Sequence, residues 1–259
     1  MTLSYALAEL EPYINWAYFY FAWQLKQQEE QERMRSEAED FLHSLDGKYK
    51  AHALVLIADA HSNGDSIELD DFSVSIPLLR QQQGSPCLCL SDFVHPVRDR
   101  LGLFATSVDQ GMETDFGADP YQKMMAQLLA DRLAEAAAER LHEQVRKELW
   151  GYAPDEHLSI HEMQQEHFQG IRPAVGYPSL PDASLNFLLD RLLGFKQIGV
   201  SLTESGAMRP HASVSGLMIA HPQARYFSVG KIGADQLRDY ARRRQLPVDT
   251  VRKFLSANL

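Results

Sequence analysis

The sequence is poor in cysteine, and this excludes a disulfide-rich secreted scaffold. Cys87 and Cys89 are the two cysteines among 259 residues. On a strand, residues two apart point to the same face, and neighbours at this spacing lie near the upper limit of disulfide geometry. Two thiols are also too few for a structural zinc site without other ligands. We therefore expect buried, reduced thiols and a cytoplasmic location.

Long hydrophobic runs and an excess of basic residues are absent as well. No stretch reaches the ~18 uncharged apolar residues of a transmembrane helix. The apolar N-terminus lacks a basic region and carries Glu9 and Glu11 early, which argues against a signal peptide. The chain has 25 Lys+Arg against 35 Asp+Glu, a net charge of −10, whereas a nucleic-acid-binding protein needs a basic face. We expect neither a membrane nor a nucleic acid as partner.

The common catalytic motifs are missing too. The sequence contains no G-x-G-x-x-G, no P-loop and no G-x-S-x-G. The segment HLSIHEMQQEH resembles a zinc-protease helix, but Gln165 stands where H-E-x-x-H requires its second histidine. We interpret this segment as a solvated helix on which His157 and His161 are incidental. No metal site is predicted.

Two further patterns have simple structural explanations. Asp59, His61 and Gly64 match the D-x-H-x-x-G pattern of corrinoid carriers, but another strand follows within a few residues. We predict a polar hairpin turn there. The arginine run 242–244 lies on a predicted helix and is interpreted as a solvated face, with a docking patch for an acidic partner as the alternative.

The apolar patterns place helices at both ends of the chain and strands in runs between them. Helical spacing covers 12–26, 34–45, 120–150 and 183–194, and two more helices begin near 234 and 248. Short or alternating apolar runs predict strands at 53–58, 72–76, 87–90, 101–108, 213–220 and 226–232. Asp182 is the expected N-cap of the helix at 183–194. This segregation favours an α+β fold, and without an evident linker we expect a single domain over 1–259.

The loop 172–178, with the sequence RPAVGYP, carries the clearest signal for a binding site. Pro173 and Pro178 fix φ and stiffen the loop, and Gly176 allows the backbone to approach a ligand closely. An arginine held on such a loop is preorganised for bidentate recognition of a carboxylate. The alternative is a rigid surface loop on which Arg172 is solvated.

This loop, read as IRPAVGYPSLPD, resembles the R-P-A-x-G-Y-P signature of the activation domain of cobalamin-dependent methionine synthase. Further segments resemble that domain in the same order, and the likeness covers nearly the whole chain: LLRQQ at 78–82, LSDFV at 90–94, the stretch 130–156, LTES at 202–205, ASVSG at 212–216, HP at 221–222 and DQLRDYARR at 235–243. The resemblance implies an α+β fold with a twisted antiparallel sheet flanked by helices.

The resemblance also implies a function in methionine biosynthesis. Members of the family bind S-adenosylmethionine and dock on a cobalamin-binding methionine synthase subunit or domain, where they support the reductive remethylation of cob(II)alamin to methylcobalamin. Flavodoxin or a similar donor supplies the electron. The resemblance then implies that this chain contacts cobalamin only on the partner protein and that it is not catalytic alone. Because the chain begins a few residues before its first predicted helix, we expect a separately encoded protein rather than an excised domain.

Seven residues match ligand-contacting positions of the family. They are Arg172 for the ligand carboxylate, Ala174 and Tyr177 on the same loop, Glu135 on the long helix, Tyr226 and Phe227 as an aromatic pair, and Asn15 in the first helix. At the last of these positions the family commonly has an aspartate that meets the ligand's ammonium group. A neutral hydrogen bond there predicts a roughly tenfold loss of affinity. Glu11, one turn earlier, is a candidate to compensate.

Two other functions stay open at this stage. A non-catalytic capping or chaperone subunit for a corrinoid protein, with weak or no S-adenosylmethionine binding, is consistent with Asn15. An autonomous small-molecule methyltransferase requires a general base beside the methyl group, and His211 and Glu135 are the candidates for that role.

Overall fold

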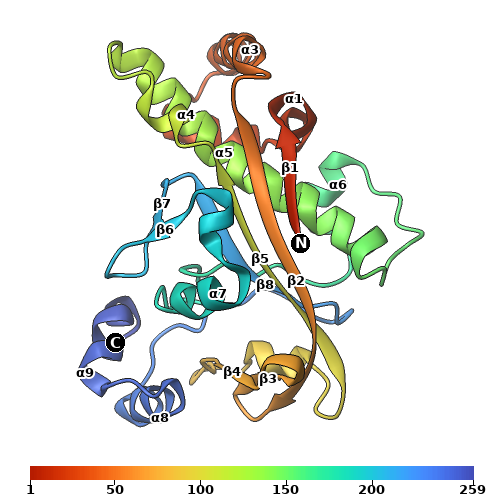
Figure 1. Cartoon of the computed structure of the whole chain (residues 1–259), viewed down its shortest axis with the longest axis vertical. Helices are drawn as coiled ribbons and strands as arrows, with labels where there is room; N and C mark the ends of the chain where they lie inside the picture. The colour runs from red at the N-terminus through yellow and green to blue at the C-terminus, as the bar shows by residue number, and fades with distance from the viewer.

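An antiparallel sheet of six strands forms the centre of the computed structural model, which describes residues 1–259 (Figure 1). The strands of this sheet are β1 (Thr2–Ala6), β2 (Lys50–Asn63), β3 (Ser66–Leu69), β4 (Val74–Pro77), β5 (Asp99–Val108) and β8 (Ser213–Met218). Their order is β4-β3-β2-β5-β8. The remaining strand, β1, pairs with β2 along the same edge as β3, but at the opposite end of β2. Two short strands, β6 (Ser201–Leu202) and β7 (Met208–Arg209), pair separately. The predicted α+β class is confirmed.

The two long central strands bury both of their faces. In β2, Ala53 and Val55 point into one core while Leu54 and Ala58 point into the other. This follows from the period of two, because successive side chains leave a strand on opposite sides. The continuous apolar run that predicted a strand at 53–58 therefore reflects helices on both faces of the sheet.

The helices cover the two faces unequally. They are α1 (Leu7–Leu10), α2 (Trp16–Ala22), α3 (Gln28–Leu45), α4 (Gly111–Thr114), α5 (Pro120–Gln144), α6 (Ile160–Gln164), α7 (Leu185–Leu193), α8 (Ala234–Arg244) and α9 (Val248–Phe254). The long helix α5 packs on β2, β5 and β8 and is flanked by α1 to α3, whereas α7 covers the opposite face (Figure 1). A smaller cluster joins α8 and α9 to Leu79, Val229 and Ile232. None of the helices is both long and apolar enough to span a membrane.

The long helix agrees with its prediction. Leu129, Leu133 and Leu141 belong to an apolar ladder with a spacing of four residues, and all three are fully buried because neighbouring elements surround the helix. Small residues let the helix approach the sheet closely, and the Thr106 hydroxyl of β5 donates a hydrogen bond of 2.9 Å to the Ala134 carbonyl oxygen. A turn of π-helix, Val145–Leu149, extends α5 to the predicted end.

The N-terminal helix predicted at 12–26 is wrong in extent. The chain starts with β1, passes through α1 and a 3-10 turn at Glu11–Tyr13, and begins α2 at Trp16. Asn15 interrupts the pattern because its side-chain oxygen accepts a hydrogen bond of 3.2 Å from the Ala17 N–H, which makes it the N-cap of α2.

Two predicted strands are absent. The segment 87–90 contributes only an isolated bridge between Cys89 and Arg80, after which the 3-10 turn Leu90–Phe93 begins. Asp92 favours that turn because its carboxylate accepts the Cys89 N–H at 2.8 Å. Residues 226–232 are irregular. Of the two cysteines, Cys89 is buried and Cys87 is partly exposed, and both are free thiols.

The interpretations of two local motifs also change. The predicted polar turn is shorter than expected, because Asp59 and His61 lie within β2 and only Gly64 and Asp65 connect it to β3. The histidine-containing helix shrinks to α6, so that His157 precedes it.

The helix at 183–194 starts at Leu185. Ser184 occupies its N-cap position, and Asp182 instead accepts the Ser184 N–H at 2.9 Å. The solvated face predicted for 242–244 is wrong for two of its three arginines, since only Arg242 is mainly exposed while Arg243 and Arg244 turn inward.

Candidate functional site

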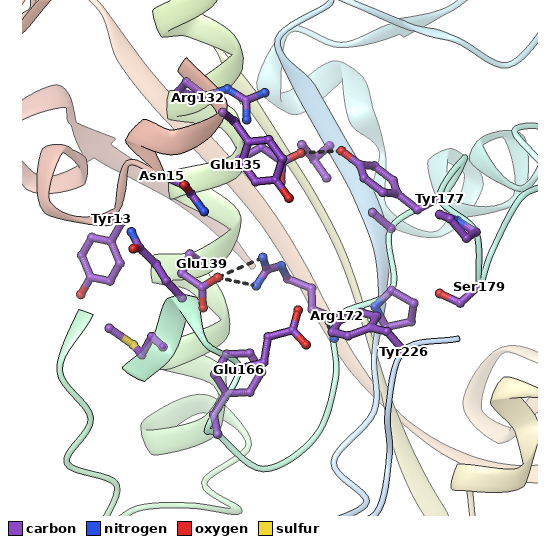
Figure 2. A pocket seen from close by; sticks show the side chains of 18 of the residues that line it. Tyr13, Asn15, Arg132, Glu135, Glu139, Glu166, Arg172, Tyr177, Ser179 and Tyr226 are labelled. Atoms are coloured by element: carbon purple, nitrogen blue, oxygen red, sulfur yellow. Dashed lines mark hydrogen bonds and ion pairs between the residues drawn. The ribbon is translucent and has the colours of Figure 1, made fainter. Parts of the chain in front are cut away.

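A cavity of about 720 Å³ lies between α5, the start of α2 and the loop that joins α6 to α7 (Figure 2). This volume falls in the usual range for small-molecule sites, ~300–1,000 Å³. We call residues 171–182 the pocket loop. All seven residues singled out from the sequence line the cavity: Asn15, Glu135, Arg172, Ala174, Tyr177, Tyr226 and Phe227. Their roles in binding a ligand stay predictions.

Arg172 is the cation at the centre of this cavity. Its side chain is only 14% exposed, and both terminal nitrogens donate to one oxygen of Glu139, at 3.3 and 3.2 Å (Figure 2). No protein acceptor binds its Nε–H, so one edge of the guanidinium is free. Because a guanidinium presents its N–H groups as a planar fork, that edge suits a carboxylate. This burial excludes the alternative interpretation, in which Arg172 is solvated on a rigid surface loop.

The first half of the pocket loop is attached to β8 like an additional strand. The Val175 N–H donates to the Ser215 carbonyl oxygen at 2.8 Å, and the Leu217 N–H donates to the Pro173 carbonyl oxygen at 3.0 Å. This close approach requires glycine at 216, because a Cβ there would overlap the Pro173 carbonyl oxygen. Gly176 then turns the chain with φ of +90°.

Three carboxylates face the guanidinium groups of Arg172 and Arg132 in the cavity wall. Glu135 accepts a hydrogen bond of 2.8 Å from the Tyr177 hydroxyl. Glu139 binds Arg172 through one oxygen, while its other oxygen is buried without a hydrogen-bond partner. Burial, reinforced by the Glu139 carboxylate, raises the pKa of Glu166 despite the opposing pull of Arg172. The excess of negative charge fits a ligand that carries one carboxylate and more than one positive group.

Several wall residues were not predicted from the sequence. Glu139 lies one helical turn after Glu135 on α5, so helical spacing was a usable signal. Tyr13 and Tyr18 flank Asn15 in sequence and line the same wall. Glu166 and Phe168 come from an irregular segment after α6 that has no periodicity to follow.

Two suggested contributors lie outside the cavity. Glu11 contacts His43 at 2.9 Å, so the expected compensation for Asn15 does not come from that residue. His211 is 89% exposed and lies 3.4 Å from Asp131, which removes it as a general base at this site. The chain contains no cluster of three or more His, Cys, Asp or Glu side chains that could hold a metal ion.

Comparison with known proteins places this geometry in a family. The sequence pattern described as "Vitamin B12 dependent methionine synthase, activation domain" matches residues 6–245. A solved structure titled "Crystal Structure of the MetH Reactivation Domain bound to AdoHcy" is 37% identical, with a TM-score of 0.94 over 100% of this chain and 90% of that chain. The resemblance inferred from the pocket loop thus extends through the whole fold, and the chain belongs to the family of vitamin B12 dependent methionine synthase activation domains.

Proposed function

We propose that this chain binds S-adenosylmethionine in the cavity and supports the reactivation of a cobalamin-dependent methionine synthase. The observation that carries the proposal is the buried Arg172, which has one free edge and stands opposite three carboxylates. S-adenosylmethionine has one carboxylate, one ammonium group and one sulfonium cation, which is the charge pattern that this wall complements. The MetH reactivation domain, which has the same fold, was solved with AdoHcy, the demethylated product.

Each part of the ligand has a candidate partner in the wall. Arg172 takes the carboxylate through its free edge. Glu139 has a buried oxygen without a hydrogen-bond partner, and an ammonium group would satisfy it. The Tyr226 hydroxyl is held in place because it accepts a hydrogen bond of 2.9 Å from the backbone N–H of Arg172. Together with Phe227, Tyr226 forms an aromatic wall for the adenosine.

The module supplies binding and orientation, and the methyl transfer takes place at the cobalt of the partner. One electron and one methyl group convert cob(II)alamin to methylcobalamin and leave S-adenosylhomocysteine. We propose a cobalamin-binding subunit or domain of methionine synthase as the partner and flavodoxin or a similar flavoprotein as the electron donor. A capping subunit without ligand is disfavoured, because the charged cavity is intact and a relative with the same fold holds AdoHcy.

Calorimetric titration with S-adenosylmethionine tests the proposal directly. We expect one ligand per chain, and tighter or faster binding when a purified cobalamin domain is present. S-adenosylhomocysteine serves as the matched ligand because it differs only by the methyl group and its positive charge. A protein that binds neither ligand, with or without the cobalamin domain, would contradict the proposal and favour the capping subunit.

Asn15→Asp is expected to tighten the binding of S-adenosylmethionine about tenfold, because a charged hydrogen bond replaces a neutral one. Aspartate also accepts the Ala17 N–H as an N-cap, so we expect α2 to keep its stability. The gain should shrink as salt is added, since screening acts over ~10 Å at 0.1 M ionic strength. Titrations at low and high salt measure both effects.

Asn63→Asp is the matched control, because it adds the same charge at the far end of β2. That variant should bind like the wild type at every salt concentration. If Asn15→Asp also binds no better than wild type, another carboxylate such as Glu139 already neutralises the ammonium group, and our account of Asn15 is wrong.

A further inference from the structure

Three adjacent arginines at the end of α8 lie in three different environments. Arg242 has a side chain that is 75% exposed. Arg243 is 14% exposed and donates to backbone carbonyl oxygens beside β3 and β4. Arg244 is 7% exposed, and its Nη2 donates to the carbonyl oxygen and hydroxyl of Ser184, at 3.2 and 2.9 Å. Only Arg244 reaches the end of the pocket loop.

Asp182 closes the pocket loop and is bound by the same helix. The residue is 1% exposed, and its Oδ2 accepts a hydrogen bond of 2.7 Å from the Tyr240 hydroxyl. The Nε of Arg244 lies 3.6 Å from that oxygen. A buried carboxylate is tolerated only with such partners, so these contacts favour one position of the loop end. Tyr240 is itself fully buried, which restricts its hydroxyl to this acceptor.

The two halves of the pocket loop therefore have separate supports. The half up to Val175 is bonded to β8, as described above. The half from Pro178 onward is held by the Val229 N–H, which donates to the Pro178 carbonyl oxygen at 2.9 Å, and by the contacts of α8 with Asp182. Tyr177 lies between these supports and projects into the cavity (Figure 2).

We propose that Tyr240 and Arg244 are positioning residues, which hold the second half of the pocket loop in the shape that binds the ligand. Neither residue lines the cavity, so both act through Asp182 and Ser184. When a loop keeps its binding shape for only a tenth of the time, the apparent Kd rises about tenfold. The affinity part of this inference rests on the proposed function, whereas the loop's own motion does not.

The test compares Arg244→Gln with Arg242→Gln and Arg243→Gln, which make the same chemical change at neighbouring positions. Each variant is titrated with S-adenosylmethionine, its melting temperature is measured, and amide hydrogen exchange is followed residue by residue. We expect Arg244→Gln to raise Kd about tenfold. It should also speed exchange at Gly176 and Leu180, whose N–H groups donate to the carbonyl oxygens of Leu180 and Tyr177 and so tie Tyr177 to the second half of the loop.

Two readouts separate positioning from general stability. Arg243→Gln removes the hydrogen bonds of a side chain that is also mostly buried, and it should lower the melting temperature while leaving Kd and loop exchange unchanged. In Arg244→Gln, the Val175 amide, which bonds to β8, should exchange as in the wild type. Tyr240→Phe, which removes only the hydroxyl, replaces Arg244→Gln in the test if that variant fails to fold. We expect faster amide exchange at Gly176 and Leu180 in Tyr240→Phe as well.

Wild-type exchange at Gly176 and Leu180 in both Arg244→Gln and Tyr240→Phe would overturn the inference. So would an equal rise in Kd for Arg243→Gln and Arg244→Gln, because α8 would then act through overall stability. A wild-type protein that binds no S-adenosylmethionine would refute the proposed function instead, and the exchange rates would still decide whether α8 positions the loop.

Discussion

Arg172→Ala is expected to weaken the binding of S-adenosylmethionine by about 2–5 kcal/mol, a rise in Kd of roughly thirtyfold to several thousandfold. We expect a large loss because the guanidinium is buried and, in the proposed complex, its free edge binds the ligand carboxylate in a cavity that otherwise carries an excess of carboxylates. Without Arg172, the ligand carboxylate would face Glu139 and Glu166. Calorimetric titration measures the change.

The same substitution also affects the folded protein, which the sequence alone did not indicate. Removing Arg172 leaves Glu139 without its cation, and breaking a buried pair by removing one partner is strongly destabilising. The double variant Arg172→Ala/Glu139→Gln removes that uncompensated charge and should recover much of the melting temperature without recovering affinity. Arg132→Ala, at the same cavity, should have a smaller effect on Kd. Wild-type affinity in Arg172→Ala would show that another group binds the carboxylate.

Gly216→Ala is expected to have the second largest effect, although residue 216 does not line the cavity. An added Cβ would overlap the Pro173 carbonyl oxygen and crowd the Ala174 Cα, so the pocket loop must move away from β8. Overpacking of this kind costs about 1–3 kcal/mol of stability. If the displaced loop returns to its binding shape one time in a hundred, Kd rises about a hundredfold. Titration and thermal unfolding measure the two effects.

Gly102→Ala provides the control for crowding in the same sheet. Its Cβ would lie 2.8 Å from the Cβ of Met218, which is two residues beyond Gly216 on β8, in the same pair of strands. We expect it to lower the melting temperature while leaving Kd close to that of the wild type. Equal losses of affinity in both variants would mean that sheet stability, rather than contact with the pocket loop, sets the shape of the site.

The site residues that could be predicted are those on segments with a strong local pattern. The stiff sequence around Arg172 indicated a preorganised loop, and Glu135 lies on the long predicted helix, at a position that the resemblance to the family singled out. Glu166 could not be found in this way, because its segment has no period and reaches the cavity only by packing against α5. Asn15 was recognised as a departure from the family, but its second role as N-cap depends on a helix start that the aromatic pattern concealed.

The sequence by itself determined the local preferences and the family: the apolar runs of β2 and β5, the long ladder of α5, and the motif of the pocket loop. These rest on residues close together in the chain, where side-chain period and backbone stiffness act directly. Only the tertiary structure decided that Arg172 pairs with Glu139, that Arg243 and Arg244 turn inward, and that residues 226–232 form no strand. For Arg172 and Arg244 the physical reason is that a buried charge is stable only beside its partner, and their partners, Glu139 and Asp182, lie tens of residues away along the chain.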